Sequence, residues 1–227
     1  DSLHPLQFAR ACASTSRVWC RHMNPVHKAK LGEAAQRLKR MDSVLVALSG
    51  GQDSALVAKI AAETLGANAQ AATLVSPLLS SAERERADAI AADIGIPHQH
   101  IEVDILGCES VARNFPDRCY HCKKRLFEAL FERARTLGLA AVCDGSNADD
   151  KHAFRPGMRA LWELGVESPL AKAGMTKDDI VTISRELGLS TWQVPSSACL
   201  ASRIAYGTPL TAERLCNIEQ AENAVRS

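Results

Sequence analysis

Residues 44–54, which read V-L-V-A-L-S-G-G-Q-D-S, constrain the fold more than any other stretch of the chain. The first five form a short apolar, β-branched run of the kind found in buried strands. Two adjacent glycines then require a tight turn, and the apolar periodicity after Asp53 indicates a helix. A strand, a glycine turn and a helix N-terminus in this order create an anion site, because the backbone can approach a phosphate closely and the helix dipole faces it.

The residues of this turn are candidate ligands of a nucleotide and its metal. Phosphate would be held by the glycines and the hydroxyl groups, namely Ser49, Gly50, Gly51 and Ser54. Asp53 is expected to bind Mg²⁺; the alternative is an ordinary turn in which Asp53 only caps the helix. The turn is not a Walker A loop, since no G-K-[ST] follows the glycines. It resembles the PP-loop, S-G-G-x-D-S, of the ATP pyrophosphatases, which implies ATP and Mg²⁺ as cofactors.

Strands and helices are expected to alternate along the rest of the chain. Further strands are predicted at 69–75, 98–103 and 140–143, with helices between them. This alternation predicts an α/β fold in which helices cover both faces of a parallel sheet, and we expect five strands. Ligands of such sheets bind at the carboxyl ends of the strands, where Ser49, Thr73 and Asp104 are expected.

Three segments are expected. Residues 1–25 mix arginines with Ser and Thr and carry a single acid, so they are transit-peptide-like, or more simply a disordered or leader segment. Residues 26–208 are expected to form the PP-loop domain. Residues 209–227 are expected to form a helix leading to a C-terminal domain that lies beyond the sequence.

Composition narrows the class of protein. A hydrophobic fraction of 46% is sufficient for a core, and a net charge of +1 argues against a nucleic-acid surface. No apolar run approaches the roughly 20 residues that span a bilayer. Eight cysteines without a secretory signal favour a reducing compartment, so we expect a cytoplasmic protein.

Three cysteines form a candidate metal site. Cys119 and Cys122 are spaced so that both thiolates can reach one metal or cluster, and they lie at the expected start of a helix. The helix N-terminus and the cation of Arg118 are expected to lower the pKa of these thiols. A structural zinc ion would require four protein ligands, whereas a trio with Cys199 suggests a 4Fe–4S cluster with one open iron. A redox pair, or three unconnected thiols, are the alternatives.

The motifs S-G-G-x-D-S, R-C-Y-H-C-K-K, D-G-S-N-A-D-D, F-R-P-G and A-C-L-A-S-R-I-A-Y-G-T together resemble the LarE family, in order from about residue 31 to 222. Members are ATP-dependent sulfur insertases that build the nickel-pincer nucleotide cofactor of lactate racemase. The resemblance implies that a carboxylate of pyridinium-3,5-biscarboxylic acid mononucleotide is adenylated and that sulfur then replaces AMP. It also implies a homo-oligomer, and the three cysteines indicate the branch of the family that carries a 4Fe–4S cluster.

The resemblance also implies roles for single residues. Gly145 should lie close to the adenosine, although it could be a plain turn glycine. The expected catalytic residues are Asp53, Cys199 and Arg203. The substrate, a phosphorylated dicarboxylate, is expected to contact Ser202, Arg203, Asp150 and Glu222. The alternative for Arg203 is that it only forms a surface ion pair. The alternative for Asp150 and Glu222 is that each is a solvated surface charge.

Two other functions remain open at this point. One is a different PP-loop enzyme, such as a tRNA thiolase that uses three cysteines and a cluster, against which the low net charge argues. The other is a non-catalytic module that binds a metal and ATP.

Overall fold

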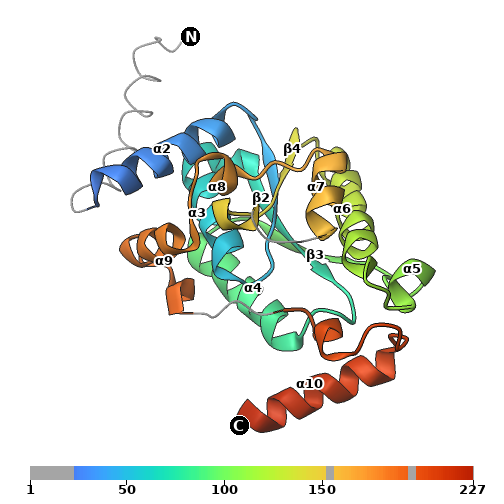
Figure 1. Cartoon of the computed structure of the whole chain (residues 1–227). Coiled ribbons are helices and arrows are strands. Elements are labelled where there is room, and N and C mark those ends of the chain that lie inside the picture. Colours follow the sequence, from blue (N-terminus) through green and yellow to red (C-terminus); the bar gives the residue numbers. More distant parts are fainter. Residues whose placement is uncertain (1–22, 152–155, 194–197, 227) are drawn as a thin grey trace.

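The computed structural model describes residues 23–151, 156–193 and 198–226, and places helices on both faces of a parallel sheet (Figure 1). Within these ranges the sheet has four strands in the order β3-β2-β1-β4. Their bounds are β1 Val44–Ala47, β2 Ala69–Val75, β3 His98–Glu102 and β4 Ala141–Cys143. The fold class predicted from the sequence is therefore confirmed. The segment interpreted as a leader lies largely outside the described residues.

The expected count of five strands is wrong for the described residues. Where a fifth strand would join the sheet beside β4, Glu167 forms a single parallel bridge with Cys143. The Glu167 N–H donates to Val142 O and the Asp144 N–H to Glu167 O, both at 2.9 Å. Pairing stops there because Pro169, which lacks an N–H, begins the short helix α8 (Pro169–Lys172).

One face of the sheet is covered by four helices. These are α2 (Pro25–Lys39), α3 (Gln52–Leu65), α4 (Ser81–Ile94) and α9 (Lys177–Glu186). Their apolar sides pack with Val44 and Val46 of β1 and with Ala69 and Ala71 of β2 into the largest core of the molecule. The start of α4 is fixed by a capping box in which Ser80 and Glu83 bond reciprocally.

The opposite face is covered by α6 (Arg118–Thr136) and α7 (Pro156–Leu164). Leu45, Ala72 and Val142 point to this side and pack against side chains of the two helices, including Phe127 and Leu130. Neighbouring strand residues face opposite sides, and both sides of this sheet are buried. Burial on both faces explains why β1 is continuously apolar rather than alternating.

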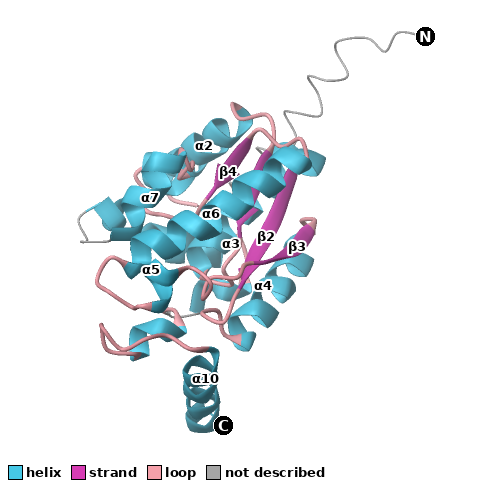
Figure 2. Ribbon diagram, turned by 90° about the vertical axis from the view of Figure 1, so that its right-hand side faces the viewer, coloured by secondary structure: helices cyan, strands magenta, loops and turns pink. Residues whose placement is uncertain are grey.

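A third apolar cluster lies beyond the carboxyl ends of the strands. The helix α10 (Ala212–Arg226) joins it through Leu215, which contacts a group that includes Ile105, after β3, and Leu200. The remaining elements here are α5 (Glu109–Ala112) and the 3₁₀ turn η4 (Leu200–Arg203). Figures 1 and 2 show α10 as the outermost element at this end of the molecule. No helix in the described ranges combines the length and apolar character required to cross a membrane.

Candidate functional site

The turn between β1 and α3 is closed by its two serines. Ser54 Oγ donates to Gly51 O at 3.0 Å and accepts the Ser49 N–H at 3.2 Å, and the two hydroxyl oxygens lie 3.1 Å apart. Gly51 is the N-cap residue of α3, and no side chain caps this helix. The interpretation of Asp53 as a simple cap is therefore wrong. The first N–H groups of α3 keep their capacity to bind an anion.

Two glycines allow neighbouring backbone segments to approach this turn. Gly50 has a φ of +74°, and a Cβ there would collide with the backbone oxygen of Glu83 on α4. A Cβ on Gly145, which follows β4, would lie 2.7 Å from the backbone N of Ser54. Gly145 is thus more than a plain turn glycine, because its missing side chain lets the segment after β4 pack against the start of α3. From α4, Arg86 Nε donates to Gly50 O at 3.0 Å and anchors the turn.

The Asp53 carboxylate is held by residues from two distant segments. Lys177 Nζ, at the first position of α9, lies 2.5 Å from Asp53 Oδ1. Asn147 Nδ2 donates to Asp53 Oδ2 at 3.3 Å, and the Asn147 N–H bonds the buried carboxylate of Asp150 at 3.0 Å. Asp150 therefore belongs with the phosphate-binding turn. Sequence reasoning did not identify Lys177 or Asn147, although Asn147 lies within the D-G-S-N-A-D-D motif.

The position of Lys177 depends on the cap of α9. Thr176 and Asp179 form a capping box, and Lys30 Nζ of α2 lies 2.5 Å from Asp179 Oδ2. His27 Nε2 lies 3.3 Å from the other carboxylate oxygen. Burial alone would raise the pKa of Asp179, but the hydrogen bonds from Lys30 and Thr176 outweigh it and lower this pKa to about 2.

The three candidate cysteines come from two segments, the start of α6 and the turn η4, and their thiols are close enough to influence one another. Cys119 and Cys122 lie in the first two turns of α6, and Cys199 is the N-cap residue of η4. Burial, reinforced by the neighbouring thiols of Cys199 and Cys119, raises the pKa of Cys122 to about 12. The expectation of a lowered pKa is thus wrong for Cys122, since burial outweighs the nearby cations.

The spacing of these thiols is wider than a single ion requires. Among the described residues they do not form a group whose ligand atoms all lie within 4.8 Å. Thiolates on one tetrahedral zinc ion would be roughly 3.8 Å apart, given Zn–S bonds of about 2.3 Å. The separation therefore argues against one shared zinc ion in this geometry, whereas a polynuclear cluster, which is larger, holds its thiolates further apart.

A buried arginine joins the two parts of the cysteine site. The guanidinium of Arg118 donates to Asn114 Oδ1 at 2.5 Å and to Ala201 O at 3.0 Å, and its other nitrogen lies 3.6 Å from Cys119 Sγ. Asn114 has a φ of 56°, and its amide donates to the carbonyl oxygens of Ala205 and Thr208, both at 3.0 Å. The start of α6 is thereby tied to the segment that follows Cys199. Sequence reasoning had assigned Arg118 only an effect on the thiol pKa.

Two of the predicted substrate-binding residues, Arg203 and Glu222, form an ion pair with each other. Arg203 Nε lies 2.5 Å from Glu222 Oε1 of α10. Arg203 also donates to Cys199 O at 3.2 Å and to Ser202 Oγ at 2.8 Å, and Ser202 Oγ donates to Cys199 O at 2.8 Å. Arg203 therefore carries an ion pair and also holds the backbone of Cys199.

The predicted site residues thus fall into two groups. The PP-loop group consists of Ser49, Gly50, Gly51, Asp53, Ser54, Gly145 and Asp150. The cysteine group consists of Cys119, Cys122, Cys199, Ser202, Arg203 and Glu222. Both groups lie at the carboxyl ends of the strands, since Ser49 follows β1 and the Leu200 N–H bonds Leu78 O after β2 at 3.2 Å. Ligands of parallel α/β sheets bind at this edge.

A parallel sheet with an S-G-G-x-D-S turn leading into a helix defines a PP-loop protein, a class that binds ATP and Mg²⁺. The family model described as NAD synthase matches residues 28–139. An uncharacterized protein of Synechocystis is 41% identical over 199 residues, which cover 88% of this chain and 74% of the relative.

The pyridinium-3,5-bisthiocarboxylic acid mononucleotide synthase of Lactiplantibacillus plantarum is 37% identical over 191 residues, or 84% of this chain and 69% of the relative. A tRNA-specific 2-thiouridylase of Streptomyces avermitilis is 34% identical over an alignment that covers 73% of this chain and 54% of the relative. The chain belongs to the LarE family, the family of that mononucleotide synthase.

Proposed function

We propose that this protein is an ATP-dependent sulfur insertase that converts a carboxylate of pyridinium-3,5-biscarboxylic acid mononucleotide into a thiocarboxylate for the nickel-pincer nucleotide cofactor. The observation that carries the proposal is the position of the PP-loop group and the cysteine group at one edge of the sheet. The 37% identity to the mononucleotide synthase supports the choice of substrate.

The first half-reaction activates the carboxylate. A substrate carboxylate oxygen attacks the α-phosphorus of ATP and pyrophosphate leaves, so that an acyl adenylate forms. The glycines and serines of the PP-loop group bind the departing pyrophosphate through backbone N–H and hydroxyl groups. Asp53 would hold Mg²⁺, which would neutralise charge on the phosphates, in place of its ion pair with Lys177. The ammonium of Lys177, beside this turn, would then be available to stabilise phosphate charge.

The second half-reaction replaces AMP with sulfur at the acyl carbon. Cys119, Cys122 and Cys199 would hold a 4Fe–4S cluster, and the thiols of Cys119 and Cys199 are close enough to Cys122 to affect its ionisation. When bound, the cluster supplies the sulfide. Arg203 and Ser202 orient the Cys199 segment through its backbone carbonyl. The Arg203 guanidinium, which pairs with Glu222, would bind a carboxylate or phosphate of the substrate.

The proposal is tested with anaerobically reconstituted protein, by measuring AMP and thiocarboxylate formation from the pyridinium dicarboxylate. Cys119→Ala, Cys122→Ala and Cys199→Ala should be equally inactive in sulfur transfer, because each removes a cluster ligand. Cys216→Ala, which changes an exposed cysteine on α10, serves as the matched control and should retain activity. Loss in Cys199→Ala alone would instead favour a route in which that cysteine gives up its own sulfur.

Thiolation of tRNA is the second candidate, since a tRNA-specific 2-thiouridylase is among the relatives. A net charge of +1 argues against an RNA surface. We expect no AMP formation when tRNA replaces the pyridinium dicarboxylate. AMP formation that depends on tRNA would refute the proposed substrate, and binding of ATP without turnover of either substrate would indicate a non-catalytic module.

A further inference from the structure

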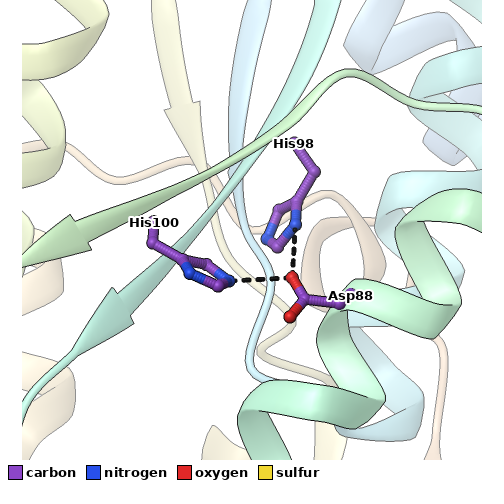
Figure 3. Close-up of side chains that lie close together, drawn as sticks. All are labelled: Asp88, His98 and His100. Carbon is purple, nitrogen blue, oxygen red and sulfur yellow. Dashed lines mark hydrogen bonds and ion pairs between the residues drawn. The ribbon is translucent and has the colours of Figure 1, made fainter.

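A group of two histidines and one aspartate lies away from both groups described above, at the free edge of the sheet. His98 and His100 are two residues apart on the edge strand β3, so both side chains point to the same face of the sheet. Asp88 reaches them from α4, which covers that face (Figure 3). We call these three residues the edge triad. Among the described residues, they form the group of His, Cys, Asp or Glu donors whose ligand atoms all lie within 4.8 Å of one another.

The donor atoms of the edge triad converge on one point. Asp88 Oδ1 lies 3.2 Å from His98 Nδ1 and 2.8 Å from His100 Nε2 (Figure 3). Two donors on one tetrahedral zinc ion are separated by roughly 3.3 Å, given bonds of about 2.0–2.1 Å. The separation from His98 is within about 0.1 Å of this value, and the separation from His100 is about 0.5 Å shorter, so a bound ion would require only a small movement of Asp88 or His100.

A hydrogen-bond chain determines which nitrogen of His98 is available. Thr73 Oγ1 donates its single proton to Leu48 O at 2.7 Å, because a carbonyl oxygen can only accept. Thr73 must then accept from His98 Nε2, which lies 2.8 Å away. In the neutral imidazole this leaves a lone pair on Nδ1, directed at the Asp88 carboxylate. Two acceptors that face each other at this distance repel unless a cation lies between them.

From this arrangement we propose that the edge triad binds a divalent transition-metal ion, such as Zn²⁺ or Co²⁺, through His98 Nδ1, His100 Nε2 and Asp88. Imidazole and carboxylate donors suit these ions, and three protein ligands leave a fourth position for water. Thr73 is the outer partner that orients His98, as is usual for metal-bound histidines. The other interpretation is an imidazolium–carboxylate ion pair without metal, and the experiment below separates the two.

The proposed ion would join the sheet edge to α4. The same helix carries Arg86, which holds Gly50 O, and Leu48 immediately precedes Ser49 of the PP-loop group. The ion would therefore brace two of the segments that position the phosphate-binding turn. This role is structural, and it does not depend on which substrate the enzyme uses.

The test is a Co²⁺ titration of the intact chain followed by absorption spectroscopy. Cobalt on the cysteines produces thiolate charge-transfer bands, whereas cobalt on the edge triad produces only weak visible bands from nitrogen and oxygen ligands. We follow the weak bands of cobalt on nitrogen and oxygen ligands. We expect His100→Gln and Asp88→Asn to lower the Co²⁺ affinity of this site at least about 100-fold, and Thr73→Val to lower it about 10-fold. His100 lies at the sheet edge with its side chain 36% exposed, so its replacement should leave the fold intact.

The matched control is His27→Gln, because His27 also contacts an aspartate, Asp179, but within the described residues forms no close group of three donors. This variant should keep the cobalt signal of nitrogen and oxygen ligands. Added Zn²⁺ should also raise the Tm of the wild-type chain more than that of His100→Gln. Identical titrations of wild type, His100→Gln and Asp88→Asn would overturn the metal site and leave the ion pair. Equal loss of the signal in His27→Gln would do so as well.

Discussion

The PP-loop group and the cysteine group lie at the same edge of the sheet but are built in different ways. The PP-loop group is fixed largely by backbone packing, and its geometry depends on the absence of side chains at Gly50 and Gly145. The cysteine group combines the start of α6 with a segment about 80 residues later, and the side chain of Arg118 bonds both. We therefore expect the PP-loop group to be disrupted by adding a side chain at a glycine, and the cysteine group by removing the guanidinium of Arg118.

The largest effect is expected for Gly50→Ala. The new methyl group would collide with the Glu83 backbone, and alanine would be forced to a φ of +74°. We expect a loss of about 2–5 kcal/mol in the free energy of unfolding and at least a 100-fold loss of ATP affinity, since α4 must move away from the turn. Denaturant titration and nucleotide binding measure the two quantities.

Gly138→Ala is the control for this prediction. Gly138 has a φ of +68°, but a Cβ there would have no neighbour within 4 Å. The control should therefore lose only the strain of about 1–2 kcal/mol and should bind ATP normally. Equal losses in both variants would show that strain, and not the close approach of α4, determines the behaviour of this turn.

The next largest effect is expected for Arg118→Gln. This change removes the charge-assisted hydrogen bonds that the buried guanidinium donates to Asn114 Oδ1 and Ala201 O, at a cost of about 2–4 kcal/mol in stability. Iron content after anaerobic reconstitution should fall severalfold, whereas ATP affinity should stay within about twofold. Arg113→Gln, which breaks an exposed pair with Glu109, should change neither quantity. A parallel loss of iron and ATP binding in Arg118→Gln would contradict the independence of the two groups.

The same contrast explains what could be predicted from the sequence. The phosphate-binding turn is local, so residues 44–54 alone indicate its strand, its glycines and its helix. Lys177 meets Asp53 from 124 positions away, and Arg118 meets Ala201 from 83 positions away, so no spacing rule connects them. The prediction of a fifth strand was wrong because a helix begins at Pro169, so that only Glu167 of this segment pairs with β4. The thiol pKa was misjudged because the burial of Cys122 arises only when α6 packs against the segment near Leu200.

A smaller loss of stability is expected for Asp179→Asn, a change that should affect the PP-loop group and not the cysteine group. Its folded pKa of about 2 lies below the ordinary value of 3.8, so its contribution to stability is fully present above about pH 5. The contribution falls as the pH drops from about 4 towards 2, where the folded state also takes up the proton. At pH 7, Asp179→Asn should lose about 2 kcal/mol in the free energy of unfolding, and its stability should depend less on pH between 4 and 2.

Asp178→Asn, at the exposed neighbouring position, is the control and should keep the pH dependence of the wild type. Because Asp179 caps the helix that presents Lys177 to Asp53, Asp179→Asn should also weaken ATP binding a few-fold without changing iron content. Unchanged ATP binding would indicate that Lys177 is positioned by contacts other than the cap.

The smallest effect on stability is expected for Glu222→Gln, on the cysteine side. Its ion pair with Arg203 is partly exposed, so its loss should cost less than about 1 kcal/mol in the free energy of unfolding. Sulfur transfer should nevertheless fall about 10-fold through a higher KM for the pyridinium dicarboxylate, because Arg203 loses the carboxylate that holds it beside Cys199. Glu213→Gln, at an exposed position of the same helix, should leave KM unchanged. A Glu222→Gln variant with normal KM would mean that the backbone bonds of Arg203 alone suffice to position its guanidinium, and that α10 contributes packing but no substrate contact.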